Sequence, residues 1–278
     1  RNAVRAVLAG QEYMRCPFEY RYDRSKPTRV PVGVGGPAPA ADSVRILNQS
    51  SADLSAVPSG SIDLILTDPP YFNNLSYSEL SDFYHVWLRE VLGRHYPGYG
   101  APHTPLGESL YGGRRNGDGP AGTDRFQATL LQVFRECWRV AKDRMVFTYH
   151  HQSADAWRCL GQALLAADFD VMDVFPVRSE GRSGLHSYTG TIKWDSVLVC
   201  RKRHERGRST LDGRSIGAAV RAARKGAAMW RRRLAAAALD FRPVDESSLR
   251  MALVVREFSR RAIEAAGLAA ALDCAARA

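Results

Sequence analysis

The clearest pattern of apolar and polar positions is a short apolar run that a pair of prolines ends. Residues 62–66 read Ile-Asp-Leu-Ile-Leu and are followed closely by Pro69 and Pro70. A run of this length is typical of a buried strand in a parallel sheet, and the prolines prevent its continuation. The strand would therefore end by presenting Asp68 at its carboxyl edge, which is where ligands bind in open α/β sheets.

Apolar runs and helical spacings alternate along the middle of the chain. Short apolar runs predict further strands at residues 44–47, 145–149, 171–175 and 196–201. Helical spacing predicts helices at residues 76–92, 123–141 and 153–166. Strands that alternate with helices predict an α/β fold with a mostly parallel sheet. No helical pattern separates the last two strands, so these can form an antiparallel pair at the edge of the sheet.

The helix predicted at residues 76–92 has a start signal and an apolar face. Ser76 and Glu79 have the spacing of a capping box. The apolar positions repeat at intervals of three and four residues, at Leu80, Phe83, Tyr84, Trp87, Leu88 and Val91. We expect this face to be part of the core.

Composition divides the chain into three segments. Residues 1–43 combine a helical pattern with a connector rich in proline and glycine, residues 44–206 hold the alternating elements, and residues 207–278 read as alanine-rich helices. Residues 93–122 are rich in glycine and proline. This stretch is either a functional loop, such as a lid or a nucleic-acid contact, or a mobile insertion.

The net charge is concentrated at one end of the chain. Residues 1–200 carry 21 basic and 21 acidic residues, whereas residues 201–278 carry 18 basic and 8 acidic residues. A basic C-terminal segment is suited to a polyanion, and a solvated arginine-rich helical face is the alternative. The five cysteines have no metal-ligand spacing, which favours a reducing cytoplasm. No apolar run has the length of a membrane span, and the first residue, Arg1, suggests an N-terminally truncated chain.

The sequence Asp-Pro-Pro-Tyr at residues 68–71 resembles the motif of amino-methyltransferases that use S-adenosylmethionine (SAM), above all adenine-specific DNA methylases. Residues 77–88, 147–151 and 193–202 resemble the same large bacterial and archaeal branch, several members of which belong to phage-defence loci. The resemblance covers roughly residues 44–202. It implies a Rossmann-like methyltransferase sheet, with the C-terminal helices as an appendage, and methylation of the adenine N6 amine in DNA for restriction-modification or phage defence.

The resemblance assigns roles to the residues of this motif. An exocyclic amine is a poor nucleophile, because its lone pair is delocalised into the base. Asp68 and the rigidly held carbonyl of Pro69 can each accept one amine hydrogen, which points the lone pair at the methyl group. Pro70 stiffens the turn, and Tyr71 can stack on a base that has left the duplex. Phe72 can form another wall of the base pocket or belong to the core.

The cofactor side has weaker signals. The glycine-rich loop of this enzyme class is missing beside Asp68, and the glycines at 33–36 read as linker, so the loop is expected upstream of Arg1, on a missing N-terminal half, or on a partner such as a defence-system subunit. Ser51 and Asp53 occupy the position at which relatives contact the SAM adenosine. Asp53 is equally suited to cap a helix that starts at Leu54.

Substrate contacts are predicted at two further places. His150 can line the base or phosphate site, whereas adjacent residues of a strand point to opposite faces, so His151 is not expected in the same pocket. Three consecutive arginines, Arg231, Arg232 and Arg233, can hold DNA phosphates. Two alternatives remain open: methylation of an RNA base or a protein glutamine, and a nucleic-acid-binding module that is inactive because it lacks the SAM loop.

Overall fold

The computed structural model describes residues 2–23, 26–32, 43–73, 77–104, 119–179, 191–204, 213–261 and 265–276. The chain divides into two compact units, Arg1–Asn48 and Gln49–Ala278. The glycines at 33–36 lie outside the described residues.

The first unit consists of a helix and a β-hairpin. Helix α1 spans Asn2–Arg15, and strands β1 (Phe18–Asp23) and β2 (Lys26–Pro31) pair antiparallel. The guanidinium of Arg29 lies over the ring of Phe18, 4.4 Å from its centroid. The sequence pattern did not predict this hairpin. The strand predicted at residues 44–47 is wrong, because this segment forms no strand in the structure.

The second unit is built on a four-stranded sheet in the order β3-β4-β6-β5. Its strands are β3 (Ile62–Thr67), β4 (Ala141–Tyr149), β5 (Phe169–Arg178) and β6 (Trp194–Lys202). Strand β3 is parallel to β4, while β6 runs antiparallel to both β4 and β5. The α/β character and the antiparallel pairing of the last two strands are therefore confirmed. The expectation of a mostly parallel sheet is wrong, because among the described strands β3 and β4 form the one parallel pair and the other two pairs are antiparallel.

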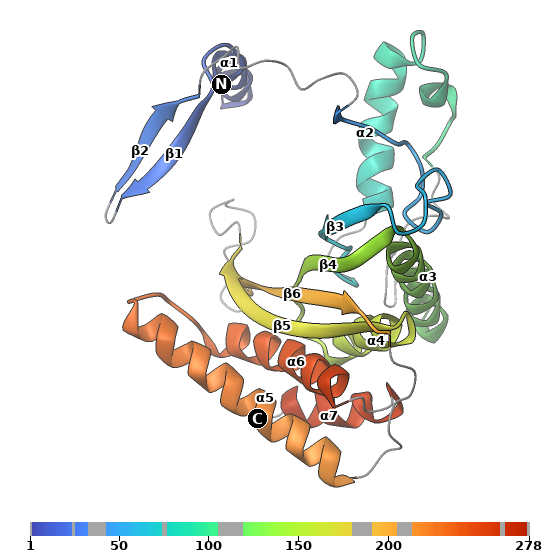
Figure 1. The fold of residues 1–278 in the computed structure, drawn as a ribbon. Helices are drawn as coiled ribbons and strands as arrows, with labels where there is room; N and C mark the ends of the chain where they lie inside the picture. The colour runs from blue at the N-terminus through green and yellow to red at the C-terminus, as the bar shows by residue number, and fades with distance from the viewer. Residues whose placement is uncertain are drawn as a thin grey trace. The chain divides into compact units, whose positions relative to one another are not determined.

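Helices lie on one side of this sheet, some in contact with its strands and others packed on those helices (Figure 1). They are α3 (Gly119–Val140), α4 (Ala154–Ala166), α5 (Gly213–Ala236), α6 (Pro243–Arg260) and α7 (Leu268–Ala276). Along β4, Met145, Phe147 and Tyr149 are buried, whereas Val146 and Thr148 between them are partly exposed. Helix α6 contacts β5 and β6, and α5 packs on α6. The C-terminal helices, predicted as an appendage, thus share the core of the sheet.

Strand β3 departs from the expected buried strand. It pairs with β4 on one side, and no described residue pairs with its other side. Leu64 and Leu66 remain 47% and 70% exposed. Within the described part of the sheet, this apolar sequence therefore belongs to an edge strand.

Helix α2 (Tyr77–Leu92) forms as predicted, but its apolar face is not core. The six side chains of this face are between 41% and 68% exposed. The opposite side of the helix contacts the loop that follows it in the chain. His85 is buried, with a ring nitrogen 2.7 Å from the Ala101 carbonyl, and Asp82 accepts a hydrogen bond from the Thr104 amide. Residues 93–104 therefore fold back on α2 through a 3-10 turn at Pro97–Gly100. Residues 105–118 lie outside the described part.

Candidate active site at the carboxyl edge of β3 and β4

The predicted catalytic carboxylate lies where two parallel strands end together. Thr67, the last residue of β3, pairs with Phe147 of β4, so the next residues, Asp68 and Thr148, are neighbours across the strands. The Thr148 hydroxyl donates to Asp68 Oδ1 at 2.5 Å, and the Tyr71 hydroxyl donates to the same oxygen at 2.7 Å. Two hydroxyl groups therefore fix one oxygen of an exposed carboxylate, while Oδ2 accepts no hydrogen bond from the described residues.

A tight turn follows the carboxylate. The Phe72 amide donates to the Pro70 carbonyl at 3.1 Å, which closes a three-residue turn around Tyr71. Pro69 is buried, and Phe72 has a φ of 42°, a conformation that a bulky residue rarely adopts. Backbone strain of this kind is held in place by surrounding packing and clusters at functional sites.

Phe72 contributes to the core. Its side chain is 5% exposed, and its ring makes edge contacts with Phe126 at 5.1 Å and with His151 at 5.7 Å. Of the two roles predicted for Phe72, these contacts fit the core residue rather than a wall of the base pocket.

Tyr71 lies in an aromatic cluster. Its ring centroid is 5.4 Å from that of Tyr149, edge to face, and 4.5 Å from that of His150. Burial, and then the hydrogen bond to Asp68, raise the pKa of the Tyr71 hydroxyl far above its usual range. Tyr71 therefore keeps its proton and remains a hydrogen-bond donor to Asp68.

His150 joins this cluster through a carboxylate of β6. Its Nδ1 is hydrogen-bonded to Asp195, and both side chains are largely buried, 16% and 15% exposed. Sequence reasoning missed Thr148 and Asp195 as members of the site. The alternation of β4 could have indicated Thr148, which lies on the same side as the exposed strand positions.

His151 points elsewhere, as the alternation predicts. Its Nδ1 accepts a hydrogen bond from the Ser153 amide at 2.9 Å, and its Nε2 lies 2.9 Å from Asn73 Oδ1. Burial lowers the pKa of His151 to about 4, so the ring is neutral near pH 7 and Nε2 carries the proton donated to Asn73. His151 fixes the chain after the Asp-Pro-Pro-Tyr turn to the start of α4.

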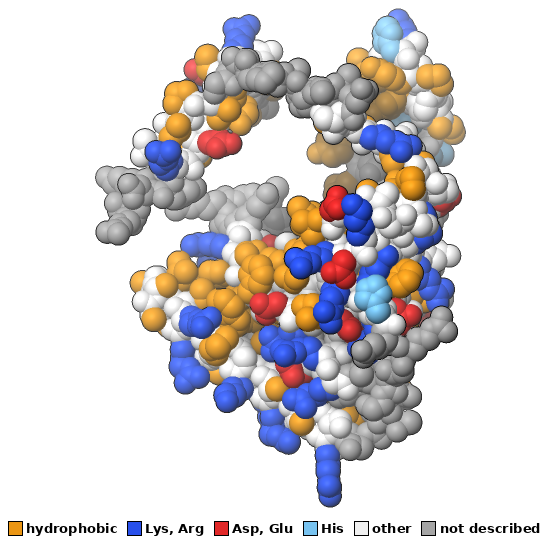
Figure 2. All heavy atoms as spheres, viewed as in Figure 1, with side chains coloured by type: hydrophobic (Ala, Val, Ile, Leu, Met, Phe, Trp, Pro, Cys, Tyr) orange, Lys and Arg blue, Asp and Glu red, His pale blue; other side chains and the backbone are white. Residues whose placement is uncertain are grey.

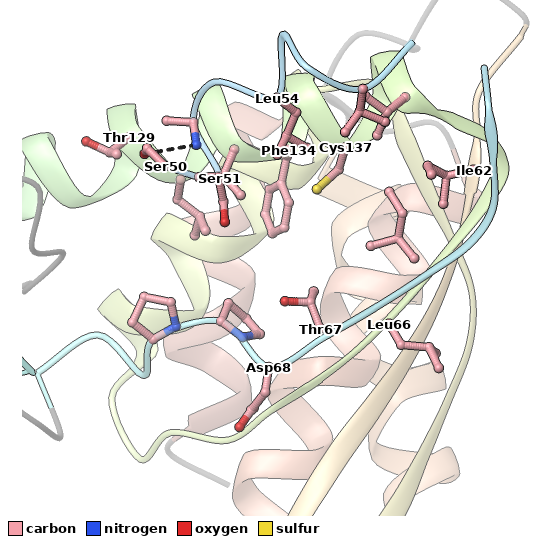
Figure 3. A pocket seen from close by; sticks show the side chains of 18 residues that line it. Ser50, Ser51, Leu54, Ile62, Leu66, Thr67, Asp68, Thr129, Phe134 and Cys137 are labelled. Carbon is pink, nitrogen blue, oxygen red and sulfur yellow. Dashed lines mark hydrogen bonds between the residues drawn. The ribbon is translucent and has the colours of Figure 1, made fainter. Parts of the chain in front are cut away.

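A cavity of about 470 Å³ lies on one side of the end of β3, between this strand and α3 (Figure 3). Asp68, Pro69 and Pro70 line it together with Ser51. Its other lining residues are mostly apolar: Ser50, Ala52, Leu54, Val57, Ile62, Ile65, Leu66, Thr67, Thr129, Leu130, Val133, Phe134, Cys137 and Val140. The Asp68 carboxylate itself points away from the cavity (Figure 3). The end of β3 thus separates an apolar cavity from a fixed carboxylate.

The loop that carries Ser51 is clamped onto α3. Arg139 donates to the carbonyls of Leu54 and Val57 at 2.8 and 3.0 Å, and Glu136 accepts a hydrogen bond from the Leu54 amide. Asp53 does not line the cavity. Its Oδ1 accepts a hydrogen bond from the Ser55 amide at 2.9 Å, which closes a turn within the loop. No helix starts at Leu54. Ser51 therefore lies beside the motif, whereas Asp53 has a local structural contact.

The three consecutive arginines lie at the end of α5, and all are exposed. Arg231 forms an ion pair with Glu246 at 3.3 Å, and the guanidinium of Arg233 lies 5.4 Å from the Trp230 ring centroid. Arg232 has no ion-pair partner among the described residues.

Comparison with known proteins adds no relative: no protein-family model matches the chain, and no curated protein is significantly similar to it. Among the described helices, none is long and apolar enough to cross a membrane. The described residues also contain no group of His, Cys, Asp and Glu side chains that could hold a metal ion.

Proposed function

We propose that this protein transfers a methyl group from SAM to the N6 amine of adenine in DNA, in restriction-modification or phage defence. The observation that carries the proposal is the end of β3, where a carboxylate fixed by two hydroxyl groups adjoins a cavity lined by Ser51, Pro69 and Pro70. The cavity volume lies in the range of small-molecule sites. Its mostly apolar lining with a few hydroxyl groups suits a purine and its ribose.

The residues present fit the adenosine part of SAM, which supplies a methyl group bound to a positively charged sulfur. Leu54 and Phe134 offer apolar surface for a base, and the hydroxyls of Ser50 and Ser51 can serve a ribose. The loop clamp of Arg139 holds these hydroxyls in place before any ligand binds, which reduces the entropy cost of binding.

Asp68 and Pro69 would orient the substrate amine. One N–H of the amine donates to the carboxylate of Asp68 and the other to the carbonyl of Pro69, so the nitrogen lone pair turns out of the ring plane. Thr148 and Tyr71 hold Asp68 Oδ1, which leaves Oδ2 for the substrate. Catalysis of this kind relies on orientation and on a preorganised charge more than on a strong base. Methyl transfer would break the bond between the methyl group and the sulfur of SAM and leave S-adenosylhomocysteine, and the methylated nitrogen would pass one proton to Asp68 Oδ2, from which it is lost to solvent.

Tyr71 and His150 would form the side of the site that meets the base. The Tyr71 hydroxyl donates a hydrogen bond to Asp68, and ring contacts with Tyr149 and His150 fix the orientation of the Tyr71 ring. A target base that stacks on Tyr71 would therefore meet a rigid ring, which lowers the entropy lost on binding.

One observation favours a second candidate, a nucleic-acid-binding module without catalysis. The described residues contain no glycine-rich loop at the carboxyl edge of a strand, although such a loop would be needed for the methionine part of SAM. Titration of SAM into the 278-residue chain by calorimetry tests this candidate, because binding heat would show a complete cofactor pocket and would contradict a module that lacks one.

The test of catalysis is the transfer of tritiated methyl groups from SAM to mixed-sequence DNA that carries no adenine methylation. Asp68→Ala should reduce transfer by about 100-fold or more, since it removes a preorganised acceptor at the reacting amine. The matched control is Asp53→Ala, which removes a nearby carboxylate that bonds only its own loop among the described contacts. Unchanged transfer by Asp68→Ala, or equal loss in both variants, would refute the role of Asp68.

A further inference from the structure

The charged residues of α5 are all basic, and they are distributed unequally around the helix. Its buried positions are Ala219, Val220, Ala223, Ala227 and Leu234, which pack toward α6 and α7. Four basic residues at intervals of seven, four and seven lie on the opposite face, because these intervals are whole numbers of helical turns to within a fraction of a residue. This basic ridge consists of Arg214, Arg221, Lys225 and Arg232, all of them exposed.

The other basic residues of α5 are used by the fold, whereas the ridge is not. Arg224 donates to the Cys274 carbonyl at 3.1 Å, Arg231 pairs with Glu246, and Arg233 lies over Trp230. No residue of the ridge forms an ion pair or hydrogen bond with the described part of the chain. The contacts therefore divide α5 into arginines that contact other side chains or carbonyls of the fold and a row of cations that faces outward. Figure 2 shows Lys and Arg side chains gathered along this helix.

A helical face that is only solvated gains nothing from a row of like charges. Exposed helices gain stability from opposite charges at intervals of three or four residues, and like charges at that spacing cost about 0.2–0.5 kcal/mol per pair. Arg221 and Lys225 are such a like-charged pair, and α5 contains no acidic residue that could relieve it. The ridge is therefore self-repelling in the free protein, and a polyanion bound along it would remove the repulsion.

The dimensions and surroundings of the ridge fit a nucleic-acid backbone. The 18 residue steps from Arg214 to Arg232 span about 27 Å of helix, which is the length of about eight base pairs of duplex. Several neighbouring positions on this side are small, Gly217, Ala218 and Ala228, and Met229 is the large side chain beside them, so a phosphate chain can approach much of the helix closely.

The ridge also ends near the candidate active site. Just after α5, the Asp240 carbonyl accepts a hydrogen bond from the Trp194 indole at 2.8 Å. Trp194 begins β6 and precedes Asp195, which is the partner of His150. The C-terminal end of the ridge, with Arg232, therefore lies toward the sheet edge that carries Asp68.

We propose that the basic ridge of α5 binds the phosphate backbone of duplex DNA and leads it to the carboxyl edge of β3 and β4. This inference rests on the proposed function in that it takes DNA as the substrate. It also revises the earlier expectation for the arginine run, because among Arg231, Arg232 and Arg233 it assigns the phosphate contact to Arg232.

The test measures binding of a fluorescent mixed-sequence duplex of about 30 base pairs by anisotropy, between about 50 and 200 mM salt. The ridge variant is Arg221→Gln, Lys225→Gln and Arg232→Gln together. The logarithm of the binding constant falls linearly with the logarithm of the salt concentration, and each lost phosphate contact makes this slope shallower by about 0.9. The slope of the triple variant should therefore be shallower than that of wild type by about 2.7. Arg232→Gln alone should make the slope shallower by about 0.9, and Arg231→Gln should leave it unchanged.

A control variant with the same change of net charge lies at the other end of the sheet strands. It consists of Arg135→Gln, Arg144→Gln and Arg201→Gln, three exposed arginines of which two face each other across β4 and β6. Circular dichroism confirms that each variant is folded. If the control variant shows an equally shallow slope, the effect depends on net charge alone and the proposal that the ridge binds DNA is wrong.

Two further outcomes complete the test. If the wild-type chain binds vesicles rich in phosphatidylserine through the ridge but does not bind the duplex, the ridge is a membrane contact and the inference is wrong. The binding assay contains no SAM, so its result does not depend on methyl transfer. Duplex binding through the ridge without transfer would refute the proposed function and leave the ridge standing.

Discussion

The hydroxyl of Thr148 allows a sharp test of how the site holds its carboxylate. Thr148→Val keeps the shape of the side chain and removes the donor that lies 2.5 Å from Asp68 Oδ1. A hydrogen bond to a charged group contributes about 1.5–3 kcal/mol. If the full contribution is expressed in the transition state, kcat/KM for methyl transfer should fall by about 10- to 100-fold. Tyr71 remains as the second donor, so the loss should be smaller than that of Asp68→Ala.

The assay follows tritiated methyl transfer to DNA at varied SAM concentration. Because Thr148 is assigned to position Asp68, kcat should fall while the KM for SAM stays near the wild-type value. Thr148→Ser, which keeps a hydroxyl, should recover most of the activity. Thr123→Val is the matched control, because Thr123 lies on α3 outside the cavity lining and its side chain forms no hydrogen bond to the described residues. The reasoning is wrong if Thr148→Val is as active as wild type, or if Thr148→Ser is equally impaired.

Two predictions concern stability. The pKa of His151 is about 4 in the folded protein against about 6.5 unfolded, so the unfolded chain takes up the proton first as the pH falls and stability present above pH 6.5 is lost. Because of His151, the free energy of unfolding measured with urea should be about 2 kcal/mol lower at pH 5 than at pH 7. His151→Gln should remove this difference, and a variant with the pH dependence of wild type would contradict the prediction. Asp245 is 1% exposed and accepts hydrogen bonds from the amides of Lys193 at 2.6 Å and Arg242 at 3.0 Å, so Asp245→Ala should cost about 2–5 kcal/mol by urea unfolding. The exposed Asp240, which lies 3.9 Å from the Lys193 ammonium, is the control, and equal losses in both variants would count against this role of Asp245.

The sequence contains the information for the motif because its geometry is local. Two consecutive prolines end a strand wherever they occur, so the position of Asp68 after β3 follows from the chain alone. Asp195 could not be predicted as the partner of His150, because this contact depends on the register between β4 and β6. Register is set by turns and by burial of a whole face, which no short window of sequence records.

The apolar face of α2 shows the same limit for packing. Spacing at three and four residues establishes that Phe83 and Trp87 share one side of a helix, but it does not state what covers that side. In the structure, the opposite side carries contacts, through His85 and Asp82, while both aromatic side chains are exposed. The hairpin of β1 and β2 was missed for another reason, since β1 alternates aromatic with charged residues and β2, with two prolines, presents no apolar run.

The edge position of β3 has a consequence for the dynamics of the site. Stability varies across a structure, and strands that are held by one neighbour open more readily than strands held by two. Asp68 follows β3, whose one described ladder is with β4, whereas β6 is paired on both sides. Local opening of the β3–β4 ladder would separate Asp68 from Thr148 while the helices and the rest of the sheet stay folded. The alignment of the Asp68 carboxylate is thus governed by a sub-global opening equilibrium rather than by the stability of the whole domain, and any strand that pairs with the edge of β3 left unpaired by the described residues would sharpen it.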